Sequence, residues 1–316
     1  MAEIVISEFM DEAAIRGILA GRDVLYDPKL VDRPEDLLQA VRSARALIVR
    51  NRTQVRGALL DAAVQLEVVG RLGVGLDNID VGACEARSIA VHPATGANDL
   101  SVAEYVITAM LVLLRGAWFA TPEVVAGKWP RMTTIGRELS GKTLGLVGLG
   151  NIARETATRA RALGMQVIAF DPLLPDGHAA WQLAAPVGFE ALLTHADALS
   201  LHVPLTPATR GMLGRTQIAA MRRGSIVINA ARGGVLDEEA VVEALRSGQL
   251  GGAALDVFER EPLDAAAGAR FASVPNLLLT PHIAGVTEES NVRVSDVTAR
   301  QVLATLERNA AGKQPS

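Results

Sequence analysis

The chain has 316 residues, which suggests about two domains, and 49% of them are hydrophobic while only 3% are aromatic. Its cores must therefore be built mostly from Ala, Val, Leu and Ile. The 31 basic and 35 acidic residues give a net charge of −4, which argues against a general nucleic-acid binder, because phosphate contacts need a basic surface.

Cysteine usage and the first residues narrow the class further. The one cysteine, Cys84, cannot form an internal disulfide and is expected to be a small buried residue, and no Cys/His cluster suggests a metal site. Glu3, Glu8 and Asp11 argue against a signal peptide. The longest apolar stretch, residues 103–114, is shorter than the ~20 residues of a membrane span. We therefore expect a cytoplasmic protein with no metal and no nucleic-acid or membrane partner.

Short β-branched runs alternate with helical patterns, which is typical of βαβ units and parallel sheets. In the first part of the chain strands are expected at 3–7, 46–50, 66–71 and 89–92, with helices at 34–42, 55–64 and 79–87. A long helix is expected from Ser101 to Phe119, capped by Asn98 or Asp99, and a Gly/Pro-rich passage follows at 121–141. A second series of strands is expected at 143–148, 166–170, 198–203, 225–229, 252–256 and 277–280.

Two features near the C-terminus complete the domain plan. The alanine-rich tract 265–269 is expected to be a surface turn, and residues 288–308 are expected to form a long helix that returns to the first domain. The chain is therefore interpreted as an α/β protein in which one domain, residues 100–286, is inserted into another made of residues 1–99 and 287–316. The crossing points near 99 and 287 would be hinges for closure on a substrate.

The strongest local signal is a dinucleotide-binding fingerprint in residues 143–172. A strand runs into Gly148-Leu149-Gly150-Asn151-Ile152-Ala153, an amphipathic helix follows, and a second strand ends at Asp171. This is G-x-G-x-x-G/A in the strand–helix–strand setting of a Rossmann domain. Backbone amides at the helix N-terminus, including those of Asn151 and Ile152, are expected to bind the pyrophosphate.

The residue that ends the second strand selects the dinucleotide. Asp171 lies where a carboxylate can bind both adenosine ribose hydroxyls, and its charge would repel a 2′-phosphate. We therefore expect NAD rather than NADP. A glycine-rich turn of another α/β fold, or another adenosine ligand such as S-adenosylmethionine, is the alternative interpretation of this segment.

Three charged residues lie just past predicted strand ends in the second series: Arg232, Glu261 and His282. Ligands of open α/β sheets bind outside the carboxyl ends of the strands, so all three are expected to face the nicotinamide. A histidine can donate and accept a proton near neutral pH, so His282 is the candidate acid–base group. Glu261 would orient the imidazole and favour its charged form, and Arg232 can bind an anion with a bidentate fork.

Seven segments together resemble the D-isomer-specific 2-hydroxyacid dehydrogenases over essentially the whole chain. They are VGRLGVGLDNID (69–80), SVAEYV (101–106), GLVGLGNIA (145–153), LHVPLT (201–206), NAARGGVLDE (229–238), LDVFEREPL (255–263) and PHIAG (281–285). The resemblance implies an NAD-dependent enzyme with a Rossmann coenzyme domain, a flavodoxin-like substrate domain and a homodimeric assembly. In such an enzyme His282 would give a proton to the carbonyl oxygen of a 2-keto acid, and Arg232 would bind the carboxylate of that substrate. Feedback by an amino acid on a C-terminal regulatory domain is not expected.

Matching the family's motifs adds cofactor contacts. Val203 and the segment Ala230, Ala231 and Arg232 are expected beside the nicotinamide, Asp256 on its carboxamide, and His282 to Gly285 along the same wall. Val74 stands where the family pattern can have a threonine that reaches the cofactor, so that hydrogen bond is lost. The dimer surface is expected on the helix from Ser101 and the 121–141 passage, with Trp118 and Trp129.

Other readings remain open at this point. A non-enzymatic NAD-sensing Rossmann protein is the alternative from another class, and phosphite oxidation is a remote one. Formate dehydrogenases have a glutamine where Glu261 stands, which argues against that activity, and no ligand set for a metal-dependent alcohol dehydrogenase is present. The remaining histidines, His92, His178, His195 and His202, are expected to be structural.

An arginine cluster predicts a substrate with a second anion besides its carboxylate. Arg50 and Arg52 follow one predicted strand and Arg71 ends the next. The amides of Leu72, Gly73, Val74 and Gly75 are expected to receive the carboxylate, and Lys128 and Arg131 to add positive charge from a dimer partner. Sulfolactate or 3-phosphoglycerate fits this pattern, and the sequence is most similar to the family's sulfolactate dehydrogenase branch. If these arginines instead pair with Glu67, Glu85 or Asp77, then glyoxylate, hydroxypyruvate or lactate is the substrate.

Overall fold

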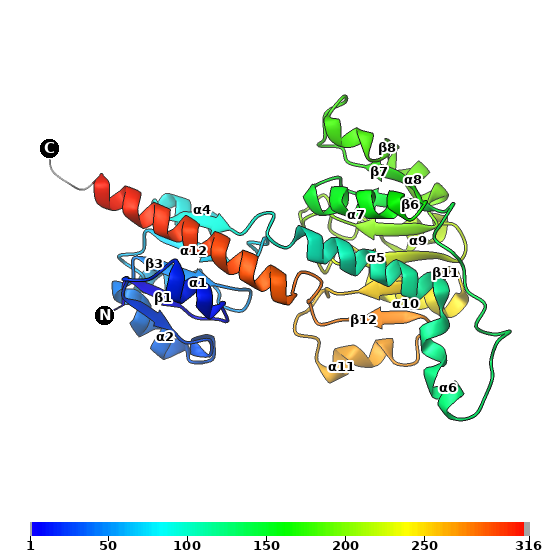
Figure 1. Ribbon diagram of the computed structural model, residues 1–316, viewed down its shortest axis with the longest axis horizontal. Coiled ribbons are helices and arrows are strands. Elements are labelled where there is room, and N and C mark those ends of the chain that lie inside the picture. The colour runs from blue at the N-terminus through cyan, green and yellow to red at the C-terminus, as the bar shows by residue number, and fades with distance from the viewer. Residues whose placement is uncertain (1, 313–316) are drawn as a thin grey trace. The chain divides into compact units, whose positions relative to one another are not determined.

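The computed structural model describes residues 2–312, and the chain divides into two compact units. Unit 1 consists of Met1–Asn98 and Val286–Ser316, and unit 2 of Asp99–Gly285. Each unit is a parallel sheet covered by helices (Figure 1), which confirms the predicted α/β class. Each is described separately below.

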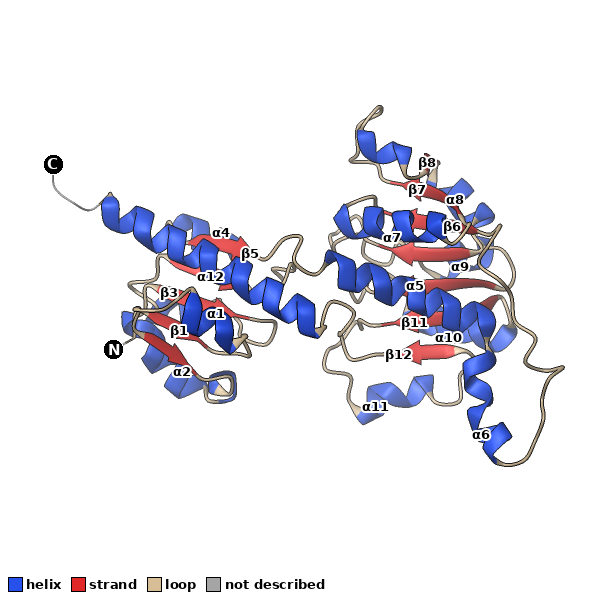
Figure 2. Ribbon diagram, in the orientation of Figure 1, coloured by secondary structure: helices blue, strands red, loops and turns tan. Residues whose placement is uncertain are grey.

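Unit 1 contains a five-stranded parallel sheet with the order β2-β1-β3-β4-β5 (Figure 2). Its strands are β1 (Ile4–Ile6), β2 (Val24–Tyr26), β3 (Ala46–Val49), β4 (Val68–Arg71) and β5 (Ala90–Pro93). Its α-helices are α1 (Glu12–Gly17), α2 (Pro34–Ala40), α3 (Ala58–Ala62), α4 (Val81–Ala86) and α12 (Glu288–Ala311). This strand order is that of flavodoxin-like folds, so the predicted architecture of this domain is confirmed.

Alternation along β3 explains the two layers of helices in unit 1. Ala46 and Ile48 pack into the core beneath α1 and α12, whereas Leu47 and Val49 pack into the core beneath α2, α3 and α4. Neighbouring side chains of a strand point to opposite faces, so an uninterrupted apolar strand needs cover on both sides. Cys84, on α4, is buried in the second of these cores, as expected.

Unit 2 contains a seven-stranded parallel sheet with the order β12-β11-β10-β9-β6-β7-β8. Its strands are β6 (Thr143–Val147), β7 (Gln166–Phe170), β8 (Ala185–Pro186), β9 (Ala198–Leu201), β10 (Ser225–Asn229), β11 (Leu250–Leu255) and β12 (Leu277–Leu279). Its α-helices are α5 (Asp99–Arg115), α6 (Thr121–Val125), α7 (Asn151–Ala162), α8 (Phe189–His195), α9 (Arg215–Ala220), α10 (Glu238–Ser247) and α11 (Ala265–Gly268). This is the Rossmann strand order with one strand added.

The order reverses between β6 and β9, and this reversal positions the site. Ligands of open α/β sheets bind at such a switch point, outside the carboxyl ends of the strands. Because all the strands are parallel, the residues that follow β6, β7, β9, β10, β11 and β12 lie along one edge of the sheet.

Two of the predicted elements differ from the sequence prediction in length or type. The helix expected to reach Phe119 ends at Arg115, because Gly116 adopts a left-handed conformation (φ 63°) and stops it. The tract expected to be a turn at 265–269 forms the short helix α11, capped by the Asp264 side chain.

Among residues 2–312 no single helix is long and apolar enough to cross a membrane; only α5 taken with Ala117–Val125 reaches that length, as a pair bent by 62°.

Candidate active site

The loop after β6 has the geometry that a dinucleotide pyrophosphate requires. Gly148 has φ +88°, and a Cβ there would lie 2.7 Å from the carbonyl oxygen of His202, so glycine is needed for the turn. Gly150 caps α7 without a side-chain hydrogen bond, and a Cβ on it would meet no atom within 4 Å. The amides of Asn151 and Ile152 therefore begin a helix that opens onto free space, where an anion is stabilised by the helix dipole.

Asp171 follows β7 and is tied to the glycine loop. Its carboxylate accepts the amide of Leu149 at 2.8 Å and the amide of Leu173 at 3.0 Å, one on each oxygen. Each carboxylate oxygen has a second lone pair, which leaves acceptors for two ribose hydroxyls. Asp171 is thus fixed beside the glycine loop with acceptors that two hydroxyls of an adenosine ribose could use.

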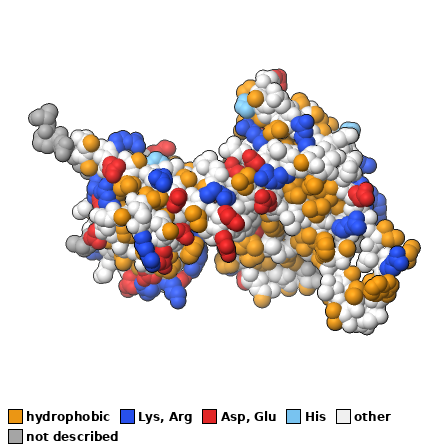
Figure 3. Space-filling view, in the orientation of Figure 1, with side chains coloured by type: hydrophobic (Ala, Val, Ile, Leu, Met, Phe, Trp, Pro, Cys, Tyr) orange, Lys and Arg blue, Asp and Glu red, His pale blue; other side chains and the backbone are white. Residues whose placement is uncertain are grey.

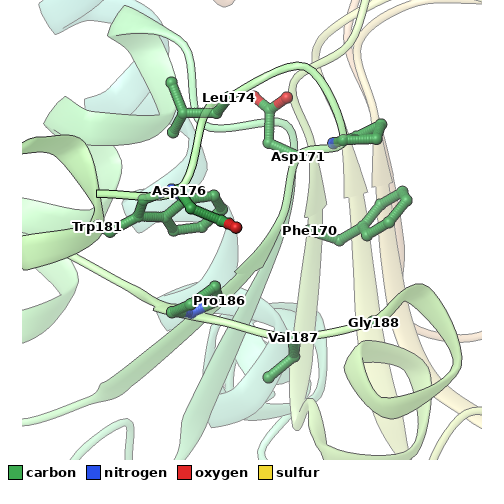
Figure 4. Close-up of a pocket in the computed structure, with 9 residues that line it drawn as sticks. Phe170, Asp171, Leu174, Asp176, Trp181, Pro186, Val187 and Gly188 are labelled. Carbon is green, nitrogen blue, oxygen red and sulfur yellow. The ribbon is translucent and has the colours of Figure 1, made fainter. Parts of the chain in front are cut away.

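A cavity of about 340 Å³ lies beside Asp171 (Figure 4). Phe170, Leu174, Trp181, Pro186 and Val187 supply its apolar walls, and Gly188 completes one side. A flat aromatic base packs well against such walls, with its ribose reaching the adjoining carboxylate. The glycine loop, Asp171 and this cavity together fit a bound NAD.

A turn after β10 presents Arg232. The buried side chain of Asn229 accepts the amide of Ala231 at 3.1 Å and donates to the carbonyl of Arg232 at 2.9 Å. Asn229 therefore closes this turn from within, a role that our sequence analysis missed although the residue stands in the NAARGG motif. The guanidinium of Arg232 is partly buried and donates to the carbonyl of Ala231 at 2.6 Å.

Glu261 and His282 form a hydrogen-bonded pair. Nδ1 of His282 donates to Oε2 of Glu261 at 2.7 Å, and the other carboxylate oxygen accepts the amide of Phe258 at 2.9 Å. Burial acts to raise the pKa of Glu261, but its bonds to His282 and Phe258, together with the charge of Arg232, produce a net lowering. With Nδ1 engaged, Nε2 is the ring nitrogen that can exchange a proton with a substrate.

Close backbone packing joins the turn of Arg232 to the loop of Glu261. A Cβ on Gly233 would lie 1.8 Å from the carbonyl oxygen of Phe258, so only glycine permits this approach. The structure thus brings together the three residues singled out as catalytic, on three loops at one edge of the sheet.

The other predicted cofactor residues lie on the same loops. Val203 packs against Gly148, and Ala230 and Ala231 are partly buried beside the core of the sheet. Asp256 is 1% exposed, and its carboxylate accepts the Thr280 hydroxyl and the amides of Ile283 and Ala284. These bonds hold Asp256 to the segment that ends at Gly285, and its contact with the nicotinamide carboxamide stays a prediction.

The remaining histidines have structural partners. His92 bonds the hydroxyl of Thr305 at 2.9 Å, and His178 accepts the amide of Ala180 at 3.1 Å. His195 bonds the carbonyl of Ala191 on the surface, and His202 bonds the hydroxyl of Ser200 at 2.9 Å. Burial lowers the pKa of His202 to about 4, so it is neutral at physiological pH.

In unit 1, Arg50 and Arg52 follow β3 on a loop fixed by a buried glutamate. Glu8, which sequence reasoning did not single out, accepts the amides of Arg50, Arg52 and Thr53. Arg52 forms an exposed ion pair with Asp32. The partly buried guanidinium of Arg50 instead donates to Oδ1 of Asn291 at 2.6 Å and lies 5.7 Å from the centre of the Phe9 ring.

The turn after β4 corrects part of the substrate prediction. The amide of Leu72 donates to the carbonyl of Val49 and that of Gly73 to the carbonyl of Arg71, each at 2.8 Å. These two amides are therefore not available to a carboxylate, and the side chain of Leu72 is only 2% exposed. The amides of Val74 and of Gly75, the next residue, remain as candidates.

Two further expectations concern charge and metal. Lys128 and Arg131 lie on an exposed segment after α6. Within residues 2–312, no group of three or more His, Cys, Asp or Glu side chains is arranged to hold a metal ion.

Comparison with known proteins decides the family. Residues 107–284 match the model of the "D-isomer specific 2-hydroxyacid dehydrogenase, NAD binding domain". The chain belongs to the D-isomer-specific 2-hydroxyacid dehydrogenases. The resemblance inferred from the sequence is thereby confirmed.

Relatives in this family match most of the chain. It is 52% identical to (S)-sulfolactate dehydrogenase of Chromohalobacter salexigens, over 96% of this chain and 97% of that protein. It is 39% identical to D-3-phosphoglycerate dehydrogenase of Methanocaldococcus jannaschii, over 96% of this chain but only 57% of that longer protein. The crystal structure of the TT0316 protein from Thermus thermophilus matches with a TM-score of 0.85 at 33% identity, over 96% of this chain and 97% of that one.

Family membership establishes the class of reaction. The protein is an NAD-dependent oxidoreductase that interconverts a 2-hydroxy acid and its 2-keto acid. The predicted cofactor and enzyme class are thus confirmed, and the non-enzymatic interpretation is not supported.

Proposed function

We propose that this dehydrogenase oxidises (S)-sulfolactate to 3-sulfopyruvate. The observation that carries the proposal is the 52% identity, over nearly the full length of both chains, to an (S)-sulfolactate dehydrogenase. A sulfonate is a second anion on the substrate, so the proposal also requires a cation besides the one that binds the carboxylate.

Of the two arginines that follow β3, Arg50 is better suited to that anion than Arg52. Its guanidinium forms no ion pair among residues 2–312, since its bonding partner is the neutral amide of Asn291. Burial lowers the pKa of Arg50 and the charge of Glu8 opposes that effect, which describes a cation that is partly desolvated without a direct counter-ion. Such a guanidinium gains most from an arriving oxyanion and can bind two of its oxygens at once.

The residues of unit 2 supply the chemistry in the oxidation direction. Nε2 of His282 accepts the proton of the substrate hydroxyl as the C–H bond breaks. The carboxylate of Glu261 then stabilises the imidazolium that has formed, and Arg232 holds the substrate carboxylate in a bidentate grip. A bound NAD would supply the hydride acceptor, so the products would be the 2-keto acid, NADH and the proton left on His282.

Initial rates of NADH formation test the substrate. The panel contains sulfolactate, 3-phosphoglycerate, glycerate and lactate, each as separate enantiomers. The highest kcat/KM is expected for (S)-sulfolactate, with lactate as the control that lacks a second anion.

Each other outcome overturns a defined part of the proposal. A preference for 3-phosphoglycerate would keep the second anion but reject the sulfonate. A preference for glycerate or lactate would reject the anionic tail, and hydroxypyruvate and glyoxylate would then be tested in the reverse direction. NADH binding without turnover of any of these acids would point to an NAD sensor.

The same proposal includes assembly as a homodimer. Hydrophobic side chains gather over α6 and the segment around it (Figure 3). Trp118, Val125, Trp129, Met132 and Ile135 are each 65% to 82% exposed. An apolar surface of this kind marks an interaction site, and a second copy of the chain is the occupant that we propose.

Light scattering tests the dimer. A Val125→Glu/Trp129→Glu variant should be monomeric where the wild type is a dimer, because burying two carboxylates at an interface is strongly unfavourable. Val64→Glu, at an equally exposed position of unit 1, is the control and should remain dimeric. A wild type that is monomeric at micromolar concentration would contradict the proposal.

A cytoplasmic location is the last part of the proposal. Its support is the chemistry, because turnover needs continuous exchange with a pool of NAD and NADH. Cell fractionation followed by assay of the 2-hydroxy acid dehydrogenase activity tests it, and activity in a membrane or exported fraction would contradict it.

A further inference from the structure

A chain of hydroxyl and carboxyl groups connects α5 with the loop of His282. The hydroxyl oxygen of Tyr105, on α5, lies 2.6 Å from Oγ1 of Thr280, which follows β12. The Thr280 hydroxyl in turn donates to Oδ1 of Asp256 at 2.6 Å. Tyr105 and Thr280 are 175 residues apart in sequence, so only the fold brings them together.

The number of available protons determines which group donates in each of these hydrogen bonds. A carboxylate can only accept, and the Thr280 hydroxyl has one proton to give. Since Thr280 donates to Asp256, the hydroxyl of Tyr105 must donate to Thr280. Burial raises the pKa of Tyr105 to about 12, so its phenol keeps that proton at any pH at which the enzyme works.

The carboxylate at the end of this chain holds the backbone on which His282 is mounted. Oδ1 of Asp256 also accepts the amide of Ile283, Oδ2 accepts the amide of Ala284, and the backbone carbonyl of Asp256 accepts the amide of His282, all at 2.8 Å. His282 itself has a backbone φ of +56°, in the left-handed region that residues other than glycine seldom adopt. A residue remains in such a conformation only when its surroundings fix it.

We propose that Tyr105 and Thr280 are positioning residues that hold the Asp256 carboxylate and, through it, the backbone turn that aims His282 at the substrate. Their side-chain hydrogen bonds run to each other and to Asp256, and neither side chain bonds Glu261 or the imidazole of His282. The inference rests on the dehydrogenase reaction of the family and does not depend on which 2-hydroxy acid is the substrate.

Substitutions at both positions test the chain with the 2-hydroxy acid that the wild type oxidises fastest in the panel above. Thr280→Val removes the donor with little change in shape and should lower kcat about tenfold or more, since displacing a catalytic group by about 1 Å can cost 10²-fold. Tyr105→Phe should lower kcat roughly two- to tenfold, the equivalent of one neutral hydrogen bond. Thr280→Ser, which restores the donor, should recover most of the rate.

A double-mutant cycle separates positioning from a general loss of structure. The same substitutions are made in a His282→Asn background, because Asn tolerates the left-handed conformation. If the network acts through His282, Thr280→Val should then change the residual kcat by less than about twofold, since residues that act as a unit are not additive. NADH affinity, measured by calorimetry, should change much less than kcat in all variants.

The only other tyrosine provides the control. Tyr26, in unit 1, donates its hydroxyl to the carbonyl of Met10 at 3.1 Å, and Tyr26→Phe should leave kcat unchanged. The proposal is overturned if Thr280→Val lowers kcat equally in the wild-type and His282→Asn backgrounds, or if Thr280→Ser fails to restore the rate.

Discussion

Nδ1 of His282 lies 2.7 Å from Oε2 of Glu261, and both side chains remain partly open to solvent, with 38% and 31% of their surface exposed. The pair thus combines a fixed ring orientation with access to one ring nitrogen. Burial favours the neutral form of Glu261, yet the net effect of its partners lowers its pKa, so the carboxylate stays charged near neutral pH. That charge would stabilise the imidazolium that forms if His282 takes up a proton from the substrate, as we propose.

Substitutions of this pair should affect the chemical step far more than binding. His282→Ala should lower kcat by ~10²–10⁴, the usual contribution of a positioned acid–base group, with NADH binding nearly intact. Glu261→Gln keeps the shape of the side chain but removes its negative charge. It should lower kcat roughly tenfold, which is the contribution of one charge-assisted hydrogen bond. Steady-state kinetics and NADH calorimetry measure both effects.

An exposed histidine provides the comparison. His195, which bonds only its own helix and the neighbouring Thr194, is replaced by alanine and should retain wild-type kinetics. A His282→Ala variant with full activity would overturn the assignment of the acid–base group.

Asp171 should decide between NAD and NADP. Its carboxylate can bind the ribose hydroxyls and would repel a 2′-phosphate. Asp171→Ala should therefore weaken NAD binding roughly 10- to 100-fold, which is the contribution of hydrogen bonds to a charged group. The same substitution should also reduce the preference for NAD over NADP. Asp176→Ala, in the same cavity, removes an equal charge and should leave the preference intact. Equal calorimetric affinity of the wild type for both dinucleotides would contradict the assignment.

Arg232 should act mainly in binding. Arg232→Ala removes the guanidinium fork that binds the substrate carboxylate. It should raise KM about tenfold or more, which is the contribution of one hydrogen bond to a charged group. The loss in kcat should be smaller and should come from weaker polarisation of the substrate carbonyl. Arg232→Lys retains the charge but not the bidentate geometry and should recover KM only in part. Arg215→Ala, which breaks a surface ion pair with Glu243, is the control. An unchanged KM in Arg232→Ala would show that the substrate carboxylate is bound elsewhere.

The sequence predicted best what local patterns determine. The bounds of β7 and β10 were predicted to the residue, because each is a short apolar run that contains β-branched residues and begins with a polar residue. β2 and β8 were not predicted: both are edge strands of two or three residues without buried positions, so they carry no such run. The candidate catalytic residues were recognisable because each directly follows a strand or stands in a short motif.

Contacts between segments that are distant in the sequence could not be predicted from it. The pairs expected for the arginines, with Glu67, Glu85 or Asp77, do not include the ion pair of Arg52 with Asp32 or the contact of Arg50 with Asn291, 241 residues away. Residue patterns show which side chains can form ion pairs, but the fold chooses among them. The same reason explains why Tyr105 and Asn229 gave no signal of their roles.

His202 should make the protein sensitive to acid. Burial lowers its pKa in the folded state from 6.5 to about 4, so between these values the unfolded chain binds a proton that the folded chain does not. Stability from this group is therefore present above pH 6.5 and is lost as the pH falls towards 4, by about 1.4 kcal/mol per pH unit at most.

Urea unfolding at pH 7 and pH 5 measures this effect. His202→Gln, which can still bond Ser200, should lose about 2 kcal/mol less than the wild type between the two pH values. His195→Gln, at an exposed site, should follow the wild type. Identical pH dependence of wild type and His202→Gln would refute the assignment.

Arg50, rather than Arg52, should select the anionic tail of the substrate. The charge of Arg52 is already neutralised by Asp32 in an exposed pair, whose rupture has little energetic consequence. Arg50 is partly buried with a neutral partner, so a sulfonate oxygen would be its first direct counter-ion. The two residues lie on one loop held by Glu8, which makes them a matched pair for comparison.

The comparison uses kcat/KM for (S)-sulfolactate relative to glycerate, which has no second anion. Arg50→Ala should lower this ratio by roughly 10- to 100-fold, the worth of charge-assisted hydrogen bonds, whereas Arg52→Ala should change it less than about threefold. Arg50→Lys should recover part of the loss, because it restores the charge but not the planar fork. A larger effect from Arg52→Ala than from Arg50→Ala would mean that the substrate displaces Asp32, and no effect from either would place the tail on other residues.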